Sequence, residues 1–184
     1  MNWSVLGFNG LRELINIHPV IVHFPVALFP ASFLLYALGV IFKRRSWCVA
    51  GRACLYLAAL GAAAAVWSGL QAEEHLAHNA RIHELLEAHE TIGIWIGWLG
   101  GILAVWSFAH VDQRPRIAPA FLILLGLTTL AVAQNSDLGG RMVFVEGAGV
   151  KAALSLMEGG HHHDPDETPD AHHHEETKEH THEH

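Results

Sequence analysis

Four apolar runs, each close to the length that crosses a bilayer, limit the folds open to this chain. They cover approximately residues 19–42, 53–72, 89–108 and 117–134. A hydrocarbon core about 30 Å thick requires roughly 20 apolar residues in a helix, and continuous apolar runs fit helices better than the alternating strands of a barrel. The sequence therefore predicts an all-α fold, an integral membrane four-helix bundle.

The two ends of the chain differ from these runs. Residues 1–17 mix apolar side chains with a single Arg12–Glu13 pair, which suits a short helix lying in the membrane interface. Residues 158–184 contain nine acidic residues and nine histidines. Because such a segment cannot bury enough apolar surface to fold, we predict a membrane domain over 1–157 and a disordered tail over 158–184.

Positive residues indicate how the bundle is oriented. They gather in the first and third loops, at Lys43, Arg44, Arg45, Arg52, Arg114 and Arg116. Cytoplasmic loops carry an excess of Lys and Arg, so we expect a multi-pass protein of the cytoplasmic (inner) membrane with both termini outside. The sequence has no pattern of a removable signal peptide. The partner it predicts is the lipid bilayer, and nothing in it indicates nucleic-acid binding.

Three histidines are expected at the outer side of the bundle. His18 and His23 open the first run and His89 opens the third. Ionisable residues within a span usually face the bundle interior and mark a functional site. On one helix His18 and His23 would point about 140° apart, whereas axial ligation of a haem needs two imidazoles from opposite sides. We therefore predict a b-type haem ligated by His89 and His23, with His18 as the alternative.

A stripe of glycines follows His89. Gly93, Gly97 and Gly101 recur every fourth residue after this histidine. Glycines at Gly93 and Gly97 would leave room for a porphyrin. Small residues at this spacing are also typical of helix–helix contacts, and the second run carries a similar series at Gly61, Ala65 and Gly69. Both interpretations stay open.

Further imidazoles and carboxylates suggest divalent transition metals. A hairpin turning near Asn79 would bring together Glu74, His75, His78, His83, Glu84 and Glu87. Such side chains suit zinc or a related ion, but their spacing is irregular and fits no defined motif, so a solvated charged surface is the favoured explanation. The tail could chelate metal loosely through its histidine runs, which are His161, His162, His163, His172, His173 and His174.

Three blocks resemble a known family of small four-span membrane proteins, domain of unknown function 2231. They are His18–Leu28, Glu87–Glu90 and Leu138–Phe144, within a resemblance covering about residues 15–151. The family has no settled activity. Its members can look like fusions to cytochrome-type or Rieske-type modules, which implies membrane electron transfer with His18, His23 and His89 as candidate haem ligands. Asp137 and Glu146 stand where histidine is expected in many members, so the resemblance implies one pair of axial ligands at most.

Three classes of function follow. The first is an electron carrier with one haem b, exchanging electrons between a membrane partner or quinone and a periplasmic acceptor. The second is a protein that binds or transports a divalent transition metal with the help of the tail. The third is a structural membrane subunit without cofactor. No nucleophile, acid–base pair or phosphate-binding loop is recognisable, so a redox carrier is favoured over an enzyme.

Overall fold

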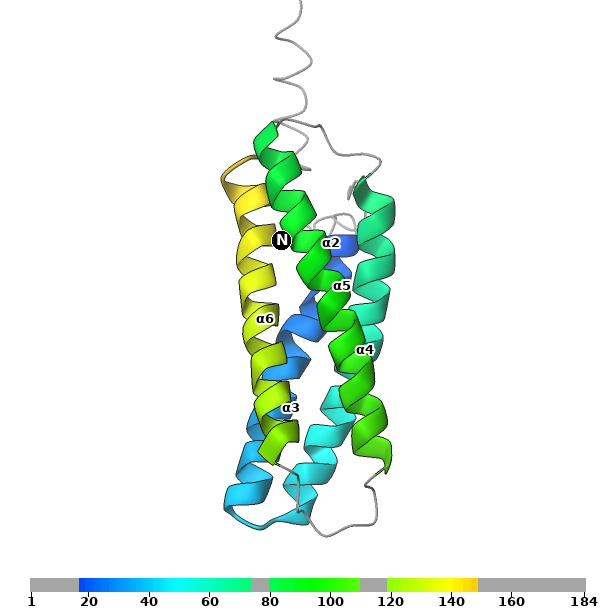
Figure 1. Ribbon diagram of the computed structural model, residues 1–184, viewed down its shortest axis with the longest axis vertical. Helices are drawn as coiled ribbons and strands as arrows, with labels where there is room; N and C mark the ends of the chain where they lie inside the picture. The colour runs from blue at the N-terminus through cyan, green and yellow to red at the C-terminus, as the bar shows by residue number, and fades with distance from the viewer. Residues whose placement is uncertain (1–16, 74–79, 110–118, 149–184) are drawn as a thin grey trace, which may run out of the picture.

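The computed structural model describes residues 17–73, 80–109 and 119–148, which form a bundle of long antiparallel helices (Figure 1). The helices are α2 (His18–Ile21), α3 (His23–Ile41), α4 (Arg45–Glu73), α5 (Ala80–Ala109) and α6 (Pro119–Phe144). Four segments are long and apolar enough to cross a membrane: His18–Ile41, Arg45–Ala72, Ala80–Phe108 and Pro119–Phe144. The prediction of an all-α, four-span fold is confirmed.

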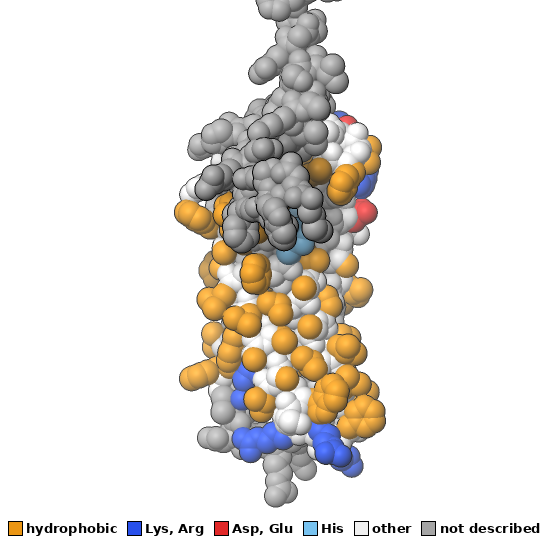
Figure 2. Space-filling view, turned by 180° about the vertical axis from the view of Figure 1, so that it is seen from behind, with side chains coloured by type: hydrophobic (Ala, Val, Ile, Leu, Met, Phe, Trp, Pro, Cys, Tyr) orange, Lys and Arg blue, Asp and Glu red, His pale blue; other side chains and the backbone are white. Residues whose placement is uncertain are grey.

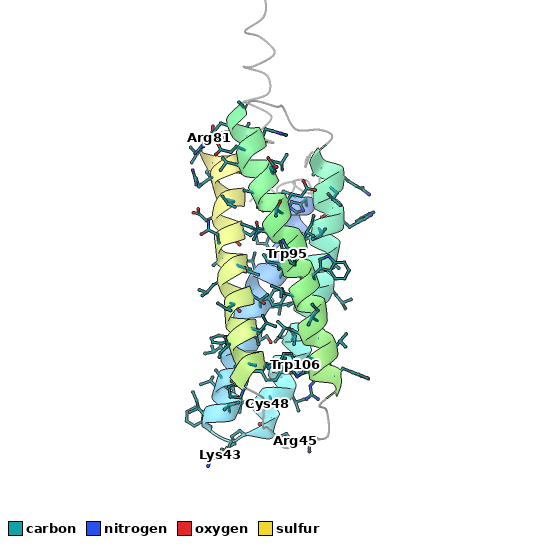
Figure 3. All side chains as sticks on the ribbon, in the orientation of Figure 1. Lys43, Arg45, Cys48, Arg81, Trp95 and Trp106 are labelled. Atoms are coloured by element: carbon teal, nitrogen blue, oxygen red, sulfur yellow. The ribbon has the colours of Figure 1, made fainter. Side chains whose placement is uncertain are left out.

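The four long helices pack as neighbours in a ring. α3 and α5 each contact both α4 and α6, so α3 lies diagonally opposite α5, and the short α2 packs on α4. Lys43 and Arg45 mark one end of the bundle and Arg81 lies at the other (Figure 3). We call the end with Lys43 and Arg45 the basic end. The opposite end, where α2 and α5 begin, is the histidine end.

The interior and the outer surface of the bundle are both apolar. Phe29, Leu55, Leu103 and Leu125 have no exposed surface and form the centre of the core. Large apolar side chains also cover the outside in a broad band, with Lys and Arg gathered at the basic end (Figure 2). An apolar patch of this extent is rare on a water-soluble monomer. It is the surface expected of helices that contact lipid.

α3 and α4 approach each other closely near the basic end. A Cβ added at Gly51 would lie 3.1 Å from the backbone nitrogen of Tyr36 and 3.2 Å from the carbonyl oxygen of Ser32. The missing side chain also lets Ser32 Oγ donate a hydrogen bond to the Gly51 carbonyl, at 2.9 Å. A small residue at a membrane helix contact permits this kind of backbone approach.

Proline shapes the start of the first span. The sequence predicts that Pro25 and Pro30 each remove a helical hydrogen bond and bend the helix. The structure has a break at Val22, between α2 and α3. Pro25 has no N–H to donate to the carbonyl of Ile21, the last residue of α2, which accounts for this break. Pro30 lies within α3, which continues past it.

The helices extend beyond two of the predicted boundaries. α4 begins at Arg45 rather than near residue 53, so Arg52 belongs to a helix and not to the loop. The polar, glycine-containing sequence 134–140 by itself predicts a turn, followed by a strand or packed loop. Instead α6 continues through it to Phe144. Its buried Leu138 and Met142 pack against Leu85 of α5, and this contact favours the helix.

Several predictions concern residues outside the described ranges. They are the interfacial helix at the N-terminus, the turn at Asn79 and the disordered tail over 158–184. The described part of α4 ends at Glu73 and that of α5 begins at Ala80.

Candidate cofactor site

His18 and His89 meet inside the histidine end of the bundle. Their ring centroids are 6.2 Å apart and the ring planes are inclined by 85°. His18 opens α2, which leads into α3, and His89 lies on α5, the diagonally opposite helix. The two imidazoles therefore approach each other across the bundle, and both are partly buried.

α4 fixes the His18 ring. Its Nδ1 lies 3.1 Å from Ser68 Oγ, and the Ser68 hydroxyl donates to the carbonyl of Ala65, also at 3.1 Å. Since the single hydroxyl hydrogen of Ser68 is used in that bond, Ser68 Oγ must accept a hydrogen from His18. A neutral His18 therefore carries its hydrogen on Nδ1 and a lone pair on Nε2.

α6 fixes the His89 ring in the same way. Its Nδ1 lies 3.0 Å from the backbone carbonyl oxygen of Asn135. A carbonyl can only accept, so Nδ1 donates and the lone pair of neutral His89 is again on Nε2. A backbone carbonyl bonded to one ring nitrogen is the usual arrangement when the other nitrogen binds a metal.

A glycine lies beside each ring. A Cβ added at Gly69 of α4 would be 3.1 Å from His18 Cε1. One added at Gly139 of α6 would be 3.2 Å from His89 Cε1. Both contacts are closer than ordinary carbon–carbon separations of about 3.5–4.0 Å. These glycines thus leave the space in which the two rings lie.

The sequence indicated these four supporting residues only in part. It assigned Gly69 to a packing series and Gly139 to a family block, and it did not single out Ser68 or Asn135. A serine in an apolar run and an asparagine in a polar one carry no distinctive spacing. Their contacts with the histidines join residues 50 and 46 positions apart in the chain.

The glycine stripe after His89 does not stay on one side of the bundle. A Cβ at Gly93 would lie 3.5 Å from Asn135 Nδ2, and one at Gly97 would lie 3.6 Å from Val66, both ordinary contact distances. One at Gly101 would meet nothing within 4 Å. A step of four residues advances about 40° beyond a full turn, which turns the stripe outward. Gly100, the residue immediately before Gly101, faces the core instead.

The packing series predicted in the second span contacts the first span. A Cβ at Gly61 of α4 would lie 3.0 Å from the Cβ of Phe24 and 3.1 Å from Cδ of Pro25. Together with the contact between Gly69 and His18, this places the small residues of α4 against α2 and α3. These small residues therefore form a close packing contact between the first two spans.

His23 lies apart from the pair. It is exposed on α3, next to Phe24, whose side chain is 59% exposed. The backbone angles stay helical through Val22, and five residues along a helix turn a side chain by about 140°, so His23 points away from the side on which His18 lies. The structure brings His18, and not His23, next to His89.

The predicted metal cluster on the hairpin is only partly described. His83 and Glu84 are both exposed on the first turns of α5, and the Glu84 carboxylate is paired with Arg81 at 2.6 Å. His75, His78 and the six tail histidines lie outside the described ranges. Within those ranges, no three His, Cys, Asp or Glu side chains gather as a metal site would require.

Comparison with known proteins identifies a family. Residues 14–152 match the family described as Predicted membrane protein (DUF2231). No curated protein and no solved structure matches the chain. Since the match spans most of the sequence and the structure has four apolar helices of membrane length, the chain belongs to this family of integral membrane proteins.

Proposed function

We propose that the protein is a membrane electron carrier that binds one b-type haem through His18 and His89. One observation carries the proposal: both rings donate from Nδ1 to a fixed acceptor, which leaves both Nε2 lone pairs available. Neutral imidazoles with one nitrogen held in this way are good metal ligands.

The separation of the rings supports the same proposal. Two imidazoles on opposite sides of one metal ion have centres about 6 Å apart, because each metal–nitrogen bond is about 2 Å long and the ring centre lies about 1 Å beyond the nitrogen. The His18 and His89 centroids are 6.2 Å apart. This separation supports His18 and His89 as the two residues that would hold the haem.

Each part of the site has a distinct role in this proposal. The haem supplies one-electron chemistry when bound. Ser68 and the Asn135 carbonyl orient the rings and strengthen their donor nitrogens. Gly69 and Gly139 leave space for the rings. The positive-inside rule places the basic end in the cytoplasm, so the site lies near the periplasmic face of the inner membrane and serves a membrane or periplasmic redox partner.

The test is a reduced-minus-oxidised absorption spectrum of the full chain purified in mild detergent, with haem quantified per polypeptide. We expect about one haem per chain in the wild type and its loss in both His18→Ala and His89→Ala. His23→Ala is the matched control, because His23 is exposed and apart from the pair, and it should retain the haem. A colourless wild type, or haem retained without His18, refutes the proposal.

A divalent transition metal is the second candidate. Asn135 Oδ1 is buried and has no hydrogen-bond partner, while the backbone carbonyl of the same residue holds His89. This amide oxygen could join the two imidazoles around an ion such as zinc. Metal analysis of the same preparations distinguishes the candidates. Stoichiometric metal without a haem spectrum, lost in His89→Ala but kept after truncation at residue 158, supports this alternative.

A further inference from the structure

A polar cluster lies in the other half of the bundle, towards the basic end. Tyr36 of α3 and Ser107 of α5 are buried, and their hydroxyl oxygens are 2.6 Å apart. Arg52 of α4 donates from Nε to Ser107 Oγ at 3.2 Å. Tyr56 lies four residues after Arg52 and so on the same side of α4. Its hydroxyl is buried and has no hydrogen-bond partner among the described residues.

The cluster has more hydrogen-bond donors than acceptors. Tyr36 and Ser107 each carry one hydroxyl hydrogen. The hydrogen bond between the two hydroxyls uses one of these hydrogens and leaves the other available. The Nη atoms of Arg52 carry four more hydrogens, and Tyr56 adds its own hydroxyl. Of these groups the Tyr56 hydroxyl is buried without a partner among the described residues, and a buried donor without a partner is costly. This set would be satisfied by a ligand with several acceptor oxygens.

The charge of Arg52 points to the same kind of ligand. A guanidinium within a membrane span requires a compensating partner. Among the described residues the only ion pair is Arg81–Glu84, at the histidine end. Asp112, the single acidic residue between α5 and α6 in the sequence, lies outside the described ranges. The tests below therefore include it.

The cluster lies a short way inside the basic end of the bundle. Ser107 lies in the last turn of α5, and the ring of Tyr36 contacts that of Phe121 in the first turn of α6 at 5.1 Å. α4 continues seven residues beyond Arg52 to Arg45, which is about 10 Å. In Figure 3, Trp106 likewise lies above Lys43 and Arg45. The cluster thus lies close to the last turn of α5 and the first turn of α6.

We infer that Arg52, Tyr36, Tyr56 and Ser107 form a binding site for a phosphate group. A planar guanidinium matches the oxygens of phosphate in two parallel hydrogen bonds. The hydroxyls of Tyr56 and of the Tyr36–Ser107 pair supply further donors. The phosphate comes from a phospholipid headgroup or from a free phosphate ion, and both sources present the same oxygens. The site is independent of the haem proposal because it lies at the other end of the bundle.

Ligand-induced thermal stabilisation of the full chain, in a detergent without phosphate, tests the site. Inorganic phosphate and a short-chain phosphatidylglycerol are titrated separately, and sodium sulfonate detergent serves as a charge control. Stabilisation by phosphate identifies a free ion as a sufficient ligand. Stabilisation by the lipid alone identifies the headgroup. The absence of stabilisation by either, or equal stabilisation by the sulfonate, overturns the inference.

Variants connect the binding to the cluster. Arg52→Gln should abolish the stabilisation, while Arg81→Gln, at the opposite end, should retain it. Tyr56→Phe is the sharper variant, because it removes a hydroxyl that has no partner in the protein and so should leave the fold intact. Loss of one hydrogen bond to a charged ligand predicts affinity weaker by about tenfold.

Two results would contradict the inference even if phosphate binds. Unchanged affinity in both Arg52→Gln and Tyr56→Phe would place the ligand elsewhere. If Asp112→Asn binds phosphate and the wild type does not, Asp112 is the natural partner of Arg52 and the cluster is an internal ion pair.

Discussion

Gly100 and Gly101 of α5 are adjacent, yet the structure predicts opposite results when each is replaced by alanine. A Cβ at Gly100 would lie 2.8 Å from Cζ of Phe29 and 3.6 Å from Cα of Ala59. At Gly101 the same Cβ would meet nothing within 4 Å, and the residue is exposed on the lipid side. Phe29 has no exposed surface, so its ring cannot move away freely.

The expected loss of stability follows from how far the distance between the added Cβ and Phe29 Cζ falls short of an ordinary contact. Ordinary carbon contacts are about 3.5–4.0 Å, so the methyl group of Gly100→Ala intrudes on Phe29 by roughly 0.7–1.2 Å. Overpacking of a core costs about 1–3 kcal/mol. The gain in helix propensity from glycine to alanine, up to about 1 kcal/mol, applies to both variants and cancels in their difference. We therefore expect Gly101→Ala to be more stable than Gly100→Ala by about 1–3 kcal/mol.

The assay is thermal unfolding of both variants and the wild type in the same detergent, monitored by the fluorescence of the six tryptophans. Each kcal/mol should shift the midpoint by about 2–4 °C for a chain of this size. If the two variants agree within about 0.5 kcal/mol, which is the usual effect of a surface substitution, Gly100 does not face Phe29 and the rotation of α5 described above is wrong.

Two further predictions concern α3 and its connection to α4. Ser32→Ala removes the buried bond to the Gly51 carbonyl and should lower the free energy of unfolding by about 0.5–1.5 kcal/mol in chemical denaturation, whereas unchanged stability would mean that the bond contributes nothing. Lys43 has a φ of 54°, a left-handed conformation that glycine adopts more easily. Lys43→Gly should therefore raise the unfolding free energy by about 1 kcal/mol in the same measurement, and a loss of stability would contradict this account of the turn.

The sequence predicted the spans well because hydropathy is averaged over many residues and every span exceeds the required length. It failed where the outcome depends on one contact between distant residues. The glycines and polar groups near Asn135 favour a turn locally, but Leu138 and Met142 bury against α5 and keep the chain helical. The helix boundaries near Arg52 and Gly139 therefore could not be predicted without knowledge of the tertiary contacts.

The sequence predicted three candidate histidines at one end of the bundle, and the structure brings two of them, His18 and His89, together. The choice between His18 and His23 depends on how the first span is rotated about its axis, because two residues about 140° apart on a helix cannot both face the bundle interior. The roles of Ser68 and Asn135 depend on which helices are neighbours, and the order of helices around a bundle is not contained in the hydropathy pattern.

The hydrogen bond from His89 to the Asn135 carbonyl has a consequence for biogenesis. Asn135 lies on α6, the last of the described helices to leave the ribosome. A nascent chain that ends before α6 already contains both imidazoles but cannot orient the second one. Any ligand of the pair must therefore be captured after synthesis of the whole bundle is complete, and truncated translation products should not compete for it.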